Sequence, residues 1–363
     1  MKNALFLGSV AGIRIYIHWT FLILIGWIVF SNLRTGANTQ EVLWSVLFVL
    51  TIFACVTLHE LGHALTAKRY HIKTRDITLL PIGGVANMES IPENPKEELL
   101  VALAGPAVNV VIFGILYLAI GHTITEESFL QLKTIGPDNF LFAVMFVNLW
   151  LAIFNLIPAF PMDGGRVFRA LLAFRMDRAR ATRIAAGLGQ VLAMGFVFLG
   201  LFYNPFLVFI GVFVFLGAQA EANQTQTHAL LHGHTVRDAL WESSPEIESA
   251  ATIRMAADRL LEGQNKYFLV VHDGKPEGSI GRDEIIRALR DLGETASVRE
   301  AMRKDLLYLS PEMPIEAALR QMQTQNQEFA LVSSNDQIVG ALDMENIAEY
   351  VMIRGALQGK KGQ

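Results

Sequence analysis

Residues Thr57-Leu-His-Glu-Leu-Gly-His-Ala64 place two histidines and a glutamate inside one of the most apolar runs of the chain. On an α-helix, His59 and His63 lie on one face, one turn apart, so both imidazoles can reach a single metal ion. Glu60 then stands beside that ion, where a carboxylate can accept a proton from water. Ionisable groups at mid-bilayer cost roughly 2.5–3.5 kcal/mol each, so three within five residues indicate a metal site. The alternative is a helix end that meets lipid headgroups, because two basic residues follow closely.

The composition indicates a membrane protein. Of the 363 residues, 52% are hydrophobic and 18% are charged, whereas about a quarter of a soluble protein is charged. The apolar excess lies almost wholly before Gln219, which predicts a membrane domain followed by a soluble one. A net charge of -4 with scattered basic residues gives no sign of a nucleic-acid interface, so we expect no nucleic-acid partner. Cys55 is the sole cysteine, which excludes an intrachain disulfide and a thiolate zinc cluster.

Six apolar runs are long enough to cross a bilayer, which takes ~20 residues per helix. They are Ile15–Leu33, Val42–Ala67, Leu99–Gly121, Phe140–Ile157, Ile184–Phe202 and Pro205–Ala218. No cleavage pattern follows the first run, so we expect an uncleaved membrane segment there.

Basic residues gather in the second and fourth loops between these runs, and loops that retain lysine and arginine stay cytoplasmic. They are Lys68, Arg69, Lys73, Arg75 and Lys96 in one loop, and Arg166, Arg169, Arg175, Arg178, Arg180 and Arg183 in the other. With six spans, the N-terminus and everything after Ala220 are then also cytoplasmic. The sequence therefore predicts a multi-pass protein of the plasma or inner membrane.

The segment Ile77–Met88 is apolar but too short to cross, and Pro81, Gly83 and Gly84 break a helix. A re-entrant or edge-strand segment fits it, and irregular backbone at membrane depth is tolerated only in protein or beside a watery cavity. We therefore expect this segment to border a cavity between helices. An ordinary cytoplasmic loop with a Pro-Gly turn is the alternative.

A hydrolytic zinc site takes three protein ligands and leaves a fourth position open, so two histidines need a partner. Asp163 is the best candidate, because it follows the fourth span at the cytoplasmic side, where the histidines are also expected. Asn155, eight residues earlier, is a candidate to polarise the scissile carbonyl or hold the oxyanion. A hydrogen bond between helices is its other interpretation.

The chain resembles the site-2 protease family of intramembrane zinc metalloproteases over roughly its first 220 residues. Four motifs in order carry the resemblance: His59-Glu-Leu-Gly-His63, Pro81-Ile-Gly-Gly84, Gly105-Pro-Ala-Val-Asn109 and Asn155-Leu-Ile-Pro-Ala-Phe-Pro-Met-Asp-Gly-Gly165. The resemblance implies one zinc ion held by His59, His63 and Asp163, with Glu60 as the catalytic base and Asn155 assisting at the carbonyl. It also implies cleavage in or near a transmembrane segment of another membrane protein. Together with the way edge strands bind extended peptides, the resemblance implies that Pro81, Gly83 and Gly84 contact the substrate.

The sequence after Gly233 repeats itself weakly at a period of ~60 residues. Thr235–Leu240 parallels Ser297–Met302, and Lys266–Val271 parallels Gln327–Val332. Each copy predicts helix, strand, turn, strand and helix, and the pair resembles a tandem of cystathionine beta-synthase (CBS) domains. We expect a membrane domain over 1–220, a linker over 221–232, CBS domains over 233–292 and 293–355, and a tail over 356–363.

The CBS resemblance implies an adenine nucleotide as a ligand, but the family's ligand pattern is altered. CBS domains usually have a Thr or Ser after the second strand and an Asp three residues later. The matching positions in this sequence are Gly281 with Glu284 and Asp343 with Asn346. A carboxylate at Asp343 would repel phosphate, although Glu284 can accept from ribose hydroxyls. A nucleotide sensor and a purely structural module, for docking or homodimerisation, therefore both stay open.

A CBS-regulated transporter or channel is the alternative function. A transport pathway distributes ionisable groups through several spans, whereas the candidates here gather at one depth near the inner face. The sequence therefore favours a zinc intramembrane metalloprotease: an α-helical polytopic membrane domain with a short re-entrant or β segment, followed by a soluble α+β CBS module.

Overall fold

The computed structural model describes residues 4–359 apart from 82, 89–91, 93, 122–127, 129–133, 242–244, 264–265 and 336. The chain divides into two compact units, Met1–Thr225 and Gln226–Gln363. Residues 360–363 of the predicted tail and residue 82 of the predicted edge segment lie outside the described residues.

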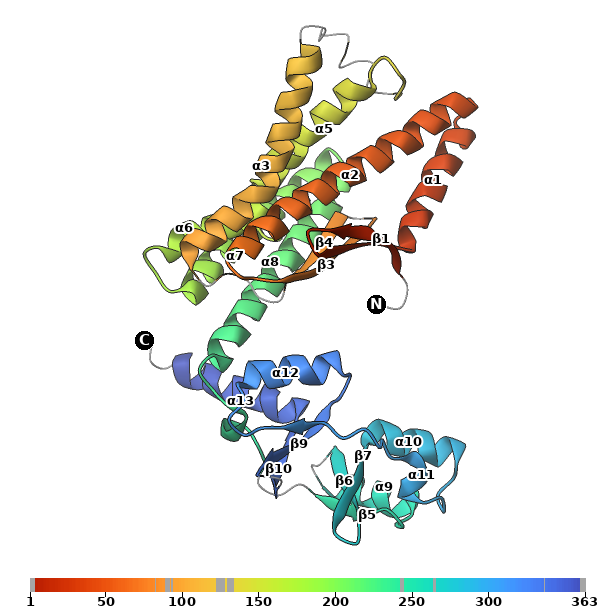
Figure 1. Ribbon diagram of the computed structural model, residues 1–363, viewed down its shortest axis with the longest axis vertical. Helices are drawn as coiled ribbons and strands as arrows, with labels where there is room; N and C mark the ends of the chain where they lie inside the picture. The colour runs from red at the N-terminus through yellow and green to blue at the C-terminus, as the bar shows by residue number, and fades with distance from the viewer. Residues whose placement is uncertain are drawn as a thin grey trace. The chain divides into compact units, whose positions relative to one another are not determined.

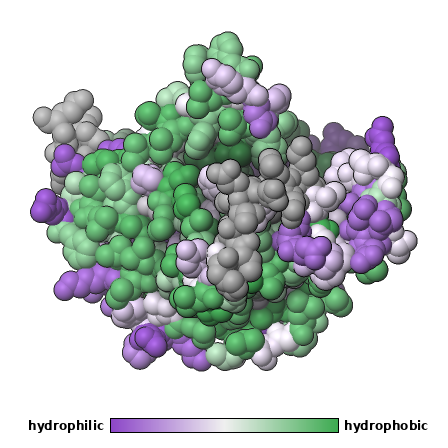
Figure 2. Space-filling view, turned by 90° about the horizontal axis from the view of Figure 1, so that it is seen from above, coloured by the Kyte–Doolittle hydropathy of each residue, from purple (hydrophilic) through white to green (hydrophobic). Residues whose placement is uncertain are grey.

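Helices dominate the first unit (Figure 1). They are α1 (Thr20–Arg34), α2 (Thr39–Arg69), α3 (Pro95–Ile120), α5 (Phe140–Asn155), α6 (Asp163–Ala173), α7 (Arg178–Phe202) and α8 (Pro205–Leu231). Among the described residues, four of them, α2, α3, α7 and α8, are long and apolar enough to cross a membrane, and α1 and α5 are shorter apolar helices. Each of the six predicted runs therefore contains an apolar helix, and the protein is a multi-pass membrane protein. Hydrophobic residues cover much of the surface visible in Figure 2.

The first predicted span begins too early, because residues 15–18 form a strand. Ala4–Val10 (β1) and Ile13–His18 (β2) make an antiparallel hairpin, and α1 starts only at Thr20. Isoleucines at 13, 15 and 17 alternate with Arg14, Tyr16 and His18, a period-two pattern that suits a half-buried strand. Uniform apolarity across the strand and the following helix hides the boundary between them.

The predicted edge segment is a hairpin, Thr74–Leu80 (β3) and Gly83–Met88 (β4), which confirms its expected strand character. The sheet order is β1-β2-β3-β4, so β4 lies at an edge of this sheet in the described part of the chain. The sheet packs beside α2 (Figure 1), with Ile77 and Leu79 buried against Leu61 and Ala64. The strand β4 is thereby held next to the helix that carries the two histidines.

The fourth loop of the sequence prediction contains a helix, which the sequence did not reveal. Helix α6 begins at Asp163, and Cβ atoms at Gly164 and Gly165 would overlap backbone atoms of residues 156–160. Glycines are therefore required for this close approach. Arg169, expected in a cytoplasmic loop, is instead fully buried on α6.

The described part of the C-terminal unit contains two three-stranded sheets of the same topology. The first has strands β5 (Glu246–Glu248), β6 (Tyr267–His272) and β7 (Lys275–Gly281); the second has β8 (Tyr308–Leu309), β9 (Phe329–Ser334) and β10 (Gln337–Asp343). Each pairs its first two strands in parallel and its last two antiparallel. The short helix η3 (Val236–Asp238) and α9 (Ile253–Glu262), α10 (Arg282–Asp291), α11 (Val298–Ala301), α12 (Ile315–Thr324) and α13 (Met344–Gly359) complete the unit.

The opening turn of each repeat packs against the sheet of the other repeat. Val236 is buried in the cluster that contains Leu309 and Ile315, and its amide donates to the Met313 carbonyl at 2.9 Å. Val298 is buried in the cluster of the first sheet, and its amide donates to the Ala251 carbonyl at 2.8 Å. The two repeats thus exchange their opening segments.

Candidate metal centre and catalytic cavity

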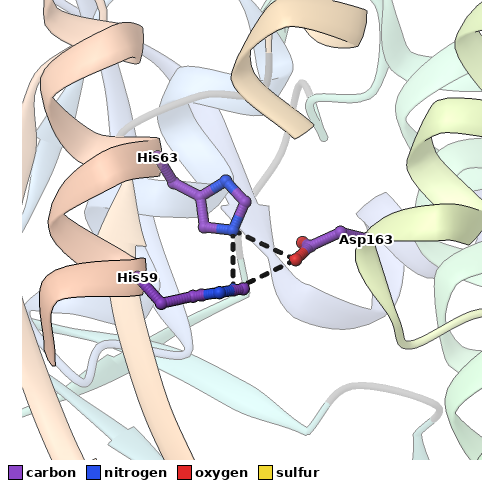
Figure 3. A group of neighbouring side chains, drawn as sticks. All are labelled: His59, His63 and Asp163. Carbon is purple, nitrogen blue, oxygen red and sulfur yellow. Dashed lines mark hydrogen bonds and ion pairs between the residues drawn. The ribbon is translucent and has the colours of Figure 1, made fainter. Parts of the chain in front are cut away.

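Three side chains from two helices converge in the membrane unit (Figure 3). His59 and His63 extend from α2, and Asp163 extends from the first turn of α6. The two Nε2 atoms lie 3.1 Å apart, and each lies 3.1 Å from Asp163 Oδ2. All three residues are less than 9% exposed. The structure therefore brings together the three residues that the sequence proposed as ligands.

Further contacts determine which nitrogen of each imidazole faces the centre. His59 Nδ1 lies 2.5 Å from Asn109 Oδ1, and His63 Nδ1 lies 2.7 Å from the Val101 carbonyl oxygen. Both partners are acceptors, so each Nδ1 carries the donated hydrogen and each Nε2 presents a lone pair. Metal-ligating histidines are held by such outer contacts.

The donor set fits a zinc ion. Two imidazole lone pairs and a carboxylate oxygen point at one another, and neither Nε2 atom carries a hydrogen. These electron-rich atoms repel one another unless a cation lies between them. Tetrahedral zinc with bonds of about 2.0–2.1 Å separates neighbouring ligand atoms by about 3.4 Å, close to the observed 3.1 Å. A buried site of this kind is consistent with metal binding.

A cavity of about 460 Å³ opens onto this centre, within the usual range for ligand pockets. Its walls include Glu60, Asn155, Gly83 and Gly84, together with the two histidines and Asp163. Pro81 lies in the turn that precedes β4. Candidates from three separate stretches of sequence therefore share one cavity.

Gly84 sets the distance between β4 and Glu60. A Cβ atom at this position would lie 2.7 Å from Glu60 Cγ and 3.3 Å from Val56 Cγ1. The backbone of β4 thus lies directly against the glutamate side chain. Gly83 has a φ of +135°, which favours glycine, and it has open space around its Cα.

Three residues that support the centre were not singled out as site residues from the sequence. Asn109 is fully buried, and its Nδ2 donates to Asn148 Oδ1 at 2.9 Å. Gly105 faces both imidazoles, since a Cβ there would lie 2.7 Å from His59 Nε2 and closer still to His63 Nε2. The signal for Asn109 and Asn148 was an uncharged polar residue inside an apolar span, which needs a partner within the protein.

The supposed nucleotide-contact positions of the C-terminal unit are engaged in local contacts. Glu284 Oε1 accepts from Arg287 at 2.7 Å and from Arg303 Nε at 3.1 Å. Asp343 and Asn346 cap each other: Asn346 N donates to Asp343 Oδ1 at 2.8 Å, and Asp343 N donates to Asn346 Oδ1 at 3.1 Å. Burial raises the pKa of the Asp343 carboxyl. A Cβ at Gly281 would lie 2.6 Å from Tyr267 Cε1, which leaves no room for a threonine.

Comparison with known proteins identifies the class. Residues 47–199 match the sequence model of Peptidase family M50, and residues 298–353 match that of the CBS domain. A zinc metalloprotease of Methanocaldococcus jannaschii is 33% identical over 332 residues, which cover 91% of both chains. Stage IV sporulation protein FB of Bacillus subtilis is 24% identical over 251 residues, covering 66% of this chain and 83% of that protein. A solved structure, the site-2 protease from M. jannaschii, is 37% identical and covers 61% of this chain and 95% of that one, with a TM-score of 0.46.

The fold and the buried centre are those of a membrane-embedded zinc metalloprotease with a CBS module. The chain belongs to Peptidase family M50 and is of the site-2 protease type.

Proposed function

We propose that this protease hydrolyses a peptide bond within or beside a transmembrane helix of another membrane protein, using one zinc ion per chain. One observation carries the proposal: the cavity that contains His59, His63 and Asp163 is also lined by Glu60 and by the edge strand β4. The histidines lie on α2, which is long and apolar enough to span a bilayer. A substrate segment that reaches this cavity therefore comes from the membrane or its boundary.

The proposed chemistry assigns a role to each residue in the cavity. When bound, zinc supplies a Lewis acid and an acidified water. Glu60 would take a proton from the attacking water as the water oxygen bonds to the scissile carbonyl carbon, and would give it to the amine nitrogen as the C–N bond breaks. Asn155 Nδ2 donates one hydrogen to the Leu151 carbonyl at 2.9 Å and has a second hydrogen for the scissile carbonyl oxygen.

The strand β4 is proposed to hold the substrate in an extended form. A helical peptide bond is sterically covered, so the substrate must unwind before attack. An edge strand presents unpaired amide and carbonyl groups that can pair with an added strand. Because Gly84 lies against Glu60, a substrate paired with β4 lies next to the proposed base.

Substituting Gly83 with valine tests the strand. Gly83→Val puts a branched side chain on the cavity wall, so cleavage falls while the zinc content stays normal. Gly36→Val is a matched control, because Gly36 also has a positive φ, of +81°, and open space, and it lies between α1 and α2. Unchanged cleavage by Gly83→Val, or an equal loss in both variants, would rule out β4 as the substrate strand.

The principal experiment measures zinc per chain and cleavage of a single-span membrane substrate by the purified protein. Wild type is expected to hold catalytic zinc and to cleave. Glu60→Gln is expected to retain this zinc but lose cleavage, whereas His59→Ala is expected to lose both. Equal cleavage by wild type and Glu60→Gln, or wild type without metal, would end the proposal.

The charge distribution of the loops supports an orientation with the N-terminus, the catalytic cavity and the C-terminal unit facing the cytoplasm of a plasma or inner membrane. Protease digestion of membrane vesicles of known sidedness tests it. The C-terminal unit should be degraded only in vesicles whose cytoplasmic face is outward.

The CBS module is proposed to act in regulation, by homodimerisation or docking, in preference to nucleotide binding. The cleft lined by Tyr267, Glu284 and Arg303 has a volume of about 60 Å³, and a hollow of about 400 Å³ shares Glu284 and Arg303 with it. A carboxylate, which repels phosphate, therefore lines both. Tyr267 stacks on Phe329, and its hydroxyl donates to Glu328. Titration with AMP and ATP should therefore give no heat of binding, whereas light scattering should show a dimer. A measured nucleotide affinity would restore the sensor interpretation.

A further inference from the structure

A second group of metal-ligating side chains lies in the C-terminal unit, apart from the catalytic cavity. His228, in the last turn of α8, and His232, just beyond its end, are four residues apart, and the His232 amide donates to the His228 carbonyl at 2.9 Å. Their rings stack with centroids 5.8 Å apart. Glu316, in the first turn of α12, lies opposite, with ligand atoms of all three residues within 4.8 Å of one another.

One oxygen of the partly buried Glu316 carboxylate lacks a donor in the described part of the chain. His228 Nε2 is 3.3 Å from Glu316 Oε2, and His232 Nδ1 is 3.9 Å from Glu316 Oε1, too long for a hydrogen bond. Oε1 is shielded from solvent and has no hydrogen-bond partner among the residues that the structure describes. An unsatisfied buried acceptor costs roughly 1–3 kcal/mol. A cation beside Oε1 would remove this cost.

The local field also favours a cation. Helix α8 ends at Leu231, and the last carbonyl groups of a helix carry partial negative charge. The two imidazoles supply neutral nitrogen lone pairs, and the carboxylate supplies a negative oxygen. Calcium and magnesium prefer sites built wholly from oxygen, so the mixed set selects a transition metal such as zinc.

We propose that His228, His232 and Glu316 bind a divalent transition-metal ion, with zinc as the preferred ion, at a second site. His228 Nε2 and His232 Nδ1 lie 3.3 and 3.9 Å from the two different oxygens of Glu316, and these distances are comparable to the spacing of about 3.4 Å between ligand atoms around tetrahedral zinc. The histidine side chains are 49% and 65% exposed, so this ion exchanges readily with solution, unlike one in the buried catalytic centre. It joins the end of α8 to α12.

The test counts zinc in the purified full-length protein in detergent. The wild-type protein is equilibrated with excess zinc and then passed through a desalting column under buffered free zinc. It should hold two ions per chain. His228→Gln and Glu316→Gln should hold one and still cleave substrate. His234→Gln is the matched control, because His234 lies in the same segment but contacts Tyr350 and Asp238 instead, and it should hold two.

Two further measurements separate metal binding from a fault in folding. When cobalt replaces zinc, the second bound cobalt ion should add a visible absorption band in wild type. Removal of one ligand should lower the affinity of this second site on the order of tenfold or more. Zinc should slow hydrogen exchange at residues 226–234 and 315–324 in wild type but not in Glu316→Gln. The proposal fails if wild type holds only one ion at saturating free zinc. It also fails if His234→Gln loses the second ion as Glu316→Gln does. The Glu60→Gln variant should still bind both ions, so failure here is distinct from failure of the proposed protease chemistry.

Discussion

The Nδ1 atom of His59 lies 2.5 Å from Oδ1 of Asn109, and this contact directs the opposite nitrogen of the ring toward Asp163. Asn109 is itself held, since its Nδ2 donates to Asn148 Oδ1, and Asn148 Nδ2 donates to the Val144 carbonyl at 2.8 Å. A chain of amides thus runs from α5 through α3 to the histidine on α2. Every member is buried, so each amide relies on its protein partners.

Replacing Asn109 should weaken zinc binding without removing a ligand. Asn109→Ala leaves the His59 Nδ1 hydrogen unpaired and the ring free to turn, and loss of an outer contact typically lowers metal affinity about 10–100-fold. Asn109→Asp keeps an acceptor and should retain more zinc. Competition with a chromogenic chelator measures the affinity. Asn223→Ala, which removes an exposed amide on α8, is the control, and an affinity for Asn109→Ala equal to that control would contradict the role.

Gly105 should tolerate no side chain. A methyl group there would overlap both imidazoles, so Gly105→Ala should displace the histidines and abolish retention of the catalytic zinc ion. Gly114→Ala on the same helix has open space around its Cβ and should bind zinc normally with unchanged or higher stability, because alanine favours a helix over glycine. Zinc per chain and the melting temperature in detergent distinguish the two variants, and full zinc occupancy in Gly105→Ala would refute the packing argument.

Arg169 should be essential for holding α6 in place. Its Nε donates to Glu98 at 2.7 Å, and its Nη1 donates to Glu221 at 2.5 Å, which joins α6 to α3 and α8. Removing one member of a buried charge network leaves its partners uncompensated and costs roughly 3–5 kcal/mol. Arg169→Met should therefore lower the melting temperature strongly, whereas Arg175→Met, at an exposed position, should not. Similar melting temperatures for the two variants would show that the network contributes little.

The metal centre was accessible from the sequence because its signals do not depend on how side chains pack. Histidines four apart in an apolar run, and an aspartate predicted to lie at the same depth, are features of spacing and charge. The roles of Glu60 and Asn155 remain predictions, although both residues line the cavity.

Features that depend on tertiary pairing were less accessible. Strand β2 was merged with the first span, because apolar sequence suits a strand and a membrane helix alike. It pairs with β1, which directly precedes it, and with β3 about sixty residues later. Arg169 was placed in a loop because basic residues near spans are usually cytoplasmic and exposed. Its burial requires Glu98 and Glu221, which lie on helices far away in sequence.

The exchange of opening turns in the CBS module gives a further prediction. Sequence proximity suggests that each opening turn packs in its own repeat, whereas each packs in the other one. Val236 opens the first repeat but packs in the second, and Val298 does the opposite. Truncating either to alanine removes two buried methyl groups and should cost roughly 2 kcal/mol. If the exchange holds, Val236→Ala speeds hydrogen exchange mainly over residues 307–347, and Val298→Ala speeds it mainly over 247–289. The reverse pattern would mean that each repeat folds with its own opening turn.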